Sequence, residues 1–295
     1  CSVVGLRPSP GRVTRGTVDT LFSPLSVQGP MARSVPDVAL FLDTMAGYCH
    51  LDPMTFDAPS LSFSHAVAAP RRPHRVAFAA TIGGSPVDQE TENICRDSMR
   101  HFKNVGSKVE EIAIDLENLE DTFLALRSQE FVIDRELQLQ RYRDQIKPDI
   151  IWNTELGLEQ SISTLAKAER ARAALYAQFN DLFSRYDLIV TPGANTPAFD
   201  VELRFPEAIN GIKLEHYMAA STLTAAVTIS ASPALSLPCG FDQYGRPIGL
   251  QLIGRPRGEA ALLAAGALFE VESGLAEQVP IDPRHGKVPP IGKLT

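Results

Sequence analysis

Apolar residues recur at three- and four-residue spacing in six segments of the chain, which is the pattern of a helix with one buried face. The start of the first segment is well marked. Ser34 and Asp37 have capping-box-like spacing, Pro36 suits a first helical turn, and the apolar stripe ends at Gly47. The predicted helices are residues 34–47, 88–105, 116–142, 158–186, 219–229 and 259–271.

Short apolar runs predict five strands, at residues 75–80, 108–114, 187–191, 234–237 and 248–253. The first two enclose a helix and form a βαβ unit, so they are expected to be parallel. The turn DQYGRP at 242–247 predicts an antiparallel hairpin between the last two. The fold class is therefore predicted as α/β, a mixed β-sheet with helices on both faces.

Prolines and glycines shape the remaining segments. Residues 1–30 contain four of each and predict turns and short strands, and residues 49–74 are polar and proline-rich and predict an irregular surface connector. No repeat or strong boundary divides the chain, so residues 1–295 are expected to form a single domain.

Composition narrows the class of protein. The chain has 28 lysine and arginine residues and 35 aspartate and glutamate residues, so its net charge is −7. This acidic balance does not indicate a nucleic-acid-binding protein. The six histidines never have HExxH spacing and the four cysteines form no CxxC pair, which predicts reduced thiols, a cytoplasmic location and no metal or cofactor. Residues 217–241 are uncharged, but Pro233, Pro238 and many hydroxyl side chains favour a buried helix and strand over a membrane span.

Three segments are candidates for chemistry, although the chain has no GxSxG, GxGxxG or P-loop motif. Gly83-Gly84-Ser85 suits either an anion nest or, more commonly, a turn with a helix cap. Residues 28–34 form a loop before a helix, and this loop suits either a pocket wall or a plain turn. Residues 228–240 are mostly small and uncharged, so a ligand or another backbone segment can approach them closely. Cys239 in this segment has no neighbouring base in the sequence and is interpreted as a structural thiol.

Five blocks, in this order, resemble the amidase-signature family almost from end to end. They are GLRPSPGRV at 5–13, VQGPMARSVPDVALFLDTMAG at 27–47, SPVDQE at 85–90, YDLIVTPGANTPA at 186–198 and SPALSLPCGFDQYGRPIGLQLIGRP at 232–256. The resemblance implies hydrolysis of a linear carboxamide by a serine nucleophile, which is activated through a second serine by a lysine base.

In that family the lysine and both serines precede the position of Cys1, which stands where an initiating Met is expected. We therefore expect an amidase-like domain that is truncated at its N-terminus and inactive alone, and none of Ser34, Ser85 or Ser236 is assigned a catalytic role. The resemblance places two segments near the substrate. The pocket candidates are Gln28, Gly29, Pro30, Met31, Thr228 and Ser232, and Ser232 departs from the Gly or Asn of many relatives.

Two other interpretations stay open. One is the hydrolase subunit of a tRNA-dependent amidotransferase, which is less favoured because Ser26-Val27-Gln28 lacks the aspartate usual before its Gly-Pro. The other is a non-catalytic truncated relative that acts as a binding or structural module, with part of its core exposed. The leading hypothesis expects a small-molecule amide as partner, no nucleic acid, no membrane and a possible homodimer.

Overall fold

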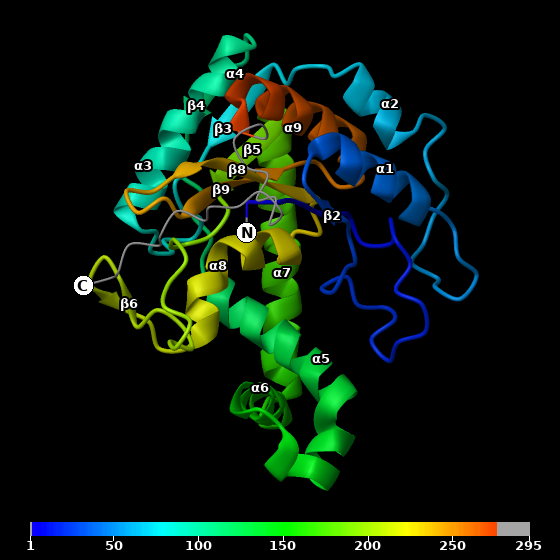
Figure 1. Cartoon of the computed structure of the whole chain (residues 1–295). Helices are drawn as coiled ribbons and strands as arrows, with labels where there is room; N and C mark the ends of the chain where they lie inside the picture. The colour runs from blue at the N-terminus through cyan, green and yellow to red at the C-terminus, as the bar shows by residue number, and fades with distance from the viewer. Residues whose placement is uncertain (1, 276–295) are drawn as a thin grey trace, which may run out of the picture.

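A seven-stranded mixed sheet lies at the centre of the computed structural model, which describes residues 2–275 (Figure 1). Its strands are β1 (Val4–Arg7), β2 (Met31–Ala32), β3 (Arg75–Phe78), β4 (Lys108–Glu111), β5 (Leu188–Pro192), β8 (Ala234–Phe241) and β9 (Pro247–Ile253). They lie in the order β2-β1-β8-β9-β5-β3-β4. The β3–β4 and β3–β5 pairs are parallel and the other pairs are antiparallel, so the predicted βαβ unit and the predicted hairpin are both present.

Helices cover both faces of this sheet, as the alternation of elements predicts. One face packs on α1 (Val35–Met45), α2 (Phe63–Ala68), α3 (Gln89–Ser98), α4 (Arg100–Asn104) and α9 (Glu259–Ser273). The other face packs on α7 (Ile162–Arg185) and α8 (Thr222–Ile229), with α5 (Leu119–Tyr142) and α6 (Pro148–Leu158) farther out. Short elements complete the chain: η1 (Arg143–Gln145), η2 (Tyr217–Ser221), and a small sheet of β6 (Ala208–Ile209) and β7 (Ile212–Lys213).

Two helices were absent from the sequence prediction. The 49–74 segment was predicted as an irregular connector, but it contains α2, whose N-cap is Ser62. Asp43 also accepts hydrogen bonds from the backbone N–H groups of Phe63 (2.6 Å) and Ser64 (3.0 Å) in its first turn. The segment after Pro148 forms α6, since proline is tolerated in a first helical turn. Gly157 lets α6 approach α5 closely, because a Cβ there would lie 2.4 Å from the carbonyl oxygen of Ser128.

The predicted start of α1 is confirmed. Ser34 is the N-cap and its side chain accepts a hydrogen bond from the backbone N–H of Asp37. The uncharged segment 217–241 contains η2, α8 and all of β8, as expected for a buried helix and strand. Within residues 2–275, no helix combines the length and the apolar character needed to cross a membrane.

A buried ion pair connects the first loop to the last helix. The Arg12 guanidinium donates to Oε2 of Glu259 from Nη2 (3.0 Å) and Nε (3.2 Å), and the backbone N–H of Ser9 donates to Oε1 (2.8 Å). The two side chains are 6% and 0% exposed. Because Glu259 begins α9, its charge also lies at the positive end of that helix. This pair fixes the loop after β1 against α9.

Candidate functional site

Both predicted pocket segments border the end of β1. The backbone N–H of Leu6 donates to the carbonyl oxygen of Pro30 (3.0 Å), which places the 28–31 segment on one side of this strand. On the other side Arg7 lies opposite Ala234, directly after Ser232 and Pro233. Two strand spacings, or about 10 Å, separate β2 from β8, the strands that these segments adjoin. The fold thus brings together residues that are about 200 positions apart in the chain.

The loop from Gln28 to Met31 is held by a close backbone contact. A Cβ on Gly29 would lie 2.0 Å from the carbonyl oxygen of Leu6 and 2.6 Å from Cδ of Pro8, so only glycine fits there. Pro30 is buried, whereas the side chain of Gln28 is exposed and that of Met31 is 72% exposed. The loop therefore has a rigid backbone and presents two free side chains.

The second segment is a tight turn between α8 and β8. Thr228 lies half-buried in the last turn of α8, and its carbonyl oxygen accepts from the backbone N–H of Ala231 (3.3 Å). Ala231 has a φ of +54°, a left-handed conformation that is costly for a residue with a Cβ. Ser232 follows; it is fully buried, and its Oγ has no hydrogen-bond partner in the described part of the chain. Such an orphan hydroxyl is uncommon in folded proteins.

A row of side chains runs across the sheet beside these segments. Strand pairing aligns Met31, Gly5, Ser236, Gln251 and Thr191 on the α8 face of the sheet. At the β5 end the row is buried, and Nε2 of Gln251 donates to Oγ1 of Thr191 (3.1 Å). At the β2 end Met31 and Ser236 are exposed, so the described residues leave this part of the sheet uncovered.

Arg7, which the sequence analysis did not single out, lies at the end of the same face. Both of its terminal nitrogens donate to the carbonyl oxygen of Leu25 (3.2 Å). Burial lowers the pKa of Arg7 to about 10, and the nearby Glu130 carboxylate opposes that shift. The alternation of apolar Val4 and Leu6 with Gly5 and Arg7 could have shown on which face of the sheet Arg7 lies. Its hydrogen-bond partners, however, come from distant segments of the chain.

The Gly83-Gly84-Ser85 segment is a turn, as the commoner interpretation predicted. Ser85 does not cap the helix, however, because Asp88 is the N-cap of α3. The buried Ser85 hydroxyl instead contacts Oγ1 of Thr222 and accepts from Nδ2 of Asn195 (2.7 Å). Its hydrogen bonds are used to join three segments of the chain.

Cys239 is a buried free thiol, in line with the structural interpretation. Its Sγ lies 3.8 Å from Sγ of Cys95 on α3. The hydrogen bond to Cys239, together with burial, raises the pKa of Cys95 well above its ordinary value. A thiol held in its protonated form is a poor nucleophile. Within residues 2–275, no group of three or more His, Cys, Asp or Glu side chains could hold a metal ion.

A protein-family model described as Amidase matches residues 1–263. An acylamidase of Rhodococcus erythropolis is 27% identical over 288 residues, which cover 96% of this chain and 60% of the relative. The A subunit of the glutamyl-tRNA(Gln) amidotransferase of Moorella thermoacetica is 32% identical over 300 residues, which cover 92% of this chain and 59% of the relative. The chain spans between 59% and 62% of the length of such curated relatives.

Solved structures share the same fold. A bacterial aryl acylamidase of the amidase signature family matches with a TM-score of 0.84 at 24% identity, over 94% of this chain and 59% of that one. A 6-aminohexanoate cyclic dimer hydrolase, solved with substrate, matches with a TM-score of 0.83 at 18% identity, over 95% of this chain and 62% of that one. The predicted α/β class, a mixed sheet with helices on both faces, is confirmed by these likenesses and by the sheet itself.

Proposed function

The chain belongs to the amidase family, and on this basis we propose that it is part of an enzyme that hydrolyses the C–N bond of a linear carboxamide. The match over residues 1–263 is the observation that carries the proposal. In the proposed reaction a serine hydroxyl attacks the amide carbonyl and its proton passes through a second serine to a lysine. The amine leaves with a proton, and water then hydrolyses the acyl ester. Backbone N–H groups beside the nucleophile stabilise the oxyanion.

We assign the lysine and both serines to a segment that precedes Cys1 in the complete protein. The uncovered row at Met31, Gly5 and Ser236 supports this assignment, because it leaves space on the sheet face next to the start of β1. In this proposal the exposed side chains of Gln28 and Met31 and the turn from Thr228 to Ser232 form one wall of the substrate pocket. Gly29 and Pro30 hold that wall in place.

A comparison of two proteins tests the assignment. One is the 295-residue chain, and the other is the proposed longer protein, which carries the assigned segment before Cys1. Release of 4-nitroaniline from acyl nitroanilides and of ammonia from aliphatic amides is measured for both. We expect turnover by the longer protein and, since the shorter chain lacks the nucleophile, at least a thousandfold lower rate for the shorter. Equal rates would overturn the assignment.

The pocket wall has its own test. Met31→Ala is expected to raise KM several-fold in the longer protein, because an apolar contact with the acyl group is lost. Val271→Ala is the matched control, since Val271 is 82% exposed on α9 and lies on the opposite side of the sheet. Equal KM values for the two variants would remove Met31 from the wall.

A second candidate function is a subunit of a tRNA-dependent amidotransferase. It is favoured by relatives that carry this name, including one that is 32% identical over 300 residues. Purification of the longer protein from its own cells separates the two functions. An amidotransferase subunit is expected to co-purify with partner subunits, whereas the proposed amidase hydrolyses amides without them.

A further inference from the structure

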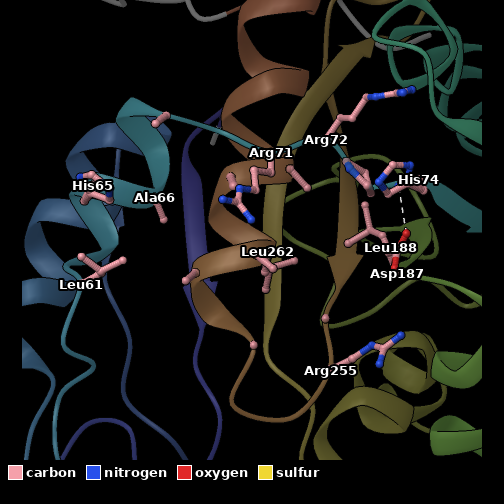
Figure 2. Close-up of a pocket in the computed structure, with 18 of the residues that line it drawn as sticks. Leu61, His65, Ala66, Arg71, Arg72, His74, Asp187, Leu188, Arg255 and Leu262 are labelled. Atoms are coloured by element: carbon pink, nitrogen blue, oxygen red, sulfur yellow. Dashed lines mark hydrogen bonds between the residues drawn. The ribbon is translucent and has the colours of Figure 1, made fainter.

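A hollow of about 640 Å³ lies between α2, α9 and the start of β5 (Figure 2). Its volume is within the range of small-molecule sites, which is roughly 300–1,000 Å³. It is on the α9 face of the sheet, whereas Arg7, Ser236 and Thr228 are on the α8 face. The hollow is therefore separate from the candidate amidase site.

Small side chains create this hollow. Ala66 of α2 faces a run of alanines on α9 that includes Ala261 and Ala264, so the two helices leave a gap that longer side chains would fill. Leu188 and Leu262 line its base but are only 2% and 1% exposed, so the apolar surface open to a ligand is that of Leu61, Ala66 and Ala261. The hollow is open to solvent, because Leu61 and Ala261 on its walls are exposed, and a ligand with an apolar body would remove this apolar surface from water.

The rim of the hollow is positively charged. Arg71, Arg72 and Arg255 line it together with His65 and His74, and Asp187 is the one acidic residue among its described lining residues. The Asp187 carboxylate is already engaged, because it accepts from the backbone N–H groups of His74 (2.8 Å) and Arg75 (3.0 Å). A basic rim on a chain with a net charge of −7 is a local feature that favours an anion.

Of the three arginines, Arg71 is the one available to a ligand. Nη1 of Arg72 donates to the carbonyl oxygen of Gly106, and in Figure 2 its guanidinium points away from the hollow. Nη2 of Arg255 donates to the carbonyl oxygen of Tyr186 (3.4 Å). Arg71 has no hydrogen-bond or ion-pair partner among residues 2–275, and Figure 2 shows it over α9 beside Leu262.

We infer that this hollow binds an amphipathic monocarboxylate, whose apolar body lies against Leu61, Ala66 and Ala261 and whose carboxylate pairs with Arg71. The guanidinium fork of Arg71 matches the two carboxylate oxygens, while the alanines of α2 and α9 leave room for a chain of several methylene groups. This inference does not depend on the proposed function, because it concerns binding without turnover at another site.

Titration calorimetry of the purified protein with sodium octanoate tests the inference. We expect saturable binding of octanoate and none of octylammonium at the same concentrations. Arg71→Gln is expected to weaken octanoate binding at least tenfold. Ala261→Phe fills the hollow from an exposed helical position and is expected to abolish binding. The control Arg100→Gln removes an exposed arginine outside the hollow and is expected to leave binding unchanged.

Several results would overturn the inference. Equal affinities of Arg71→Gln and Arg100→Gln would show that Arg71 does not bind the anion, and octanoate binding that survives Ala261→Phe would place the site elsewhere. Failure of octanoate to bind at all would overturn the whole inference. Binding only to phosphatidylglycerol vesicles would indicate a membrane surface instead of a free carboxylate. Ala66→Leu is a second filling variant that keeps the test decisive if Ala261→Phe does not fold.

Discussion

Replacement of Glu259 by glutamine is expected to destabilise the protein by about 3–5 kcal/mol, because it leaves a buried guanidinium without its counter-charge. Arg12 is 6% exposed and Glu259 is fully buried, so water cannot replace the lost carboxylate. The Arg12 guanidinium lies over the rings of Phe56 (4.4 Å) and Phe63 (5.5 Å), and these are no substitute for an anion. In a chain of this length the loss corresponds to about 5–8 °C in Tm.

The assay is urea unfolding followed by circular dichroism, with the free energy of unfolding extrapolated to water. Glu111→Gln is the matched control, because the Arg96–Glu111 pair has a short distance (2.7 Å) but is 36% and 54% exposed. Exposed pairs contribute at most about 1 kcal/mol. The double variant Arg12→Met, Glu259→Gln should lose less than the sum of the single variants, since it removes the unpaired charge. A loss for Glu259→Gln no larger than that for Glu111→Gln would show that the buried Glu259 carboxylate contributes no more than an exposed one.

Three further outcomes are expected. Ser232→Ala should leave the free energy of unfolding unchanged or raise it, because the Ser232 hydroxyl is buried without a partner among the described residues. The same variant should change the KM for amides. An unchanged KM would remove Ser232 from the pocket wall. Gly29→Ala should lower the free energy of unfolding in urea by at least about 2 kcal/mol. Gly5→Ala is the control and should lower it little, since a Cβ on Gly5 would meet Met31 at an ordinary 3.6 Å. Similar decreases for the two variants would contradict this prediction. Burial lowers the pKa of His101, so the unfolded chain takes up a proton first as the pH falls through about 6.5, and stability falls with it. Urea midpoints at pH 7 and pH 5 should therefore differ less in His101→Phe than in the unchanged protein, and equal differences would contradict this.

Local signals in the sequence were sufficient for the elements whose stability is local. The Ser34 cap and the DQYGRP hairpin each depend on neighbouring residues, and both are present. Helix α2 has a local N-cap, Ser62, but its first turn is also held by the Asp43 carboxylate, which lies 20 positions before Phe63. Nothing near Phe63 in the sequence indicates that contact.

The same distinction holds at the candidate site. The 28–31 and 228–232 segments could be identified from family blocks, but their position on either side of β1 follows from strand pairing. The hydrogen bonds of Arg7 connect it to Pro24 and Leu25, and the carboxylate that opposes the lowering of its pKa is that of Glu130 on α5. These partners depend on how the loop and α5 pack, so residue patterns could not reveal them.

Covalent labelling of the longer protein with a fluorophosphonate, followed by peptide mass spectrometry, locates the nucleophilic serine. The probe phosphonylates an activated serine and leaves ordinary hydroxyl groups unmodified. The account predicts one labelled serine, located before Cys1, and no label in the 295-residue chain alone. A label on Ser34, Ser85, Ser236 or another serine of this chain would contradict it.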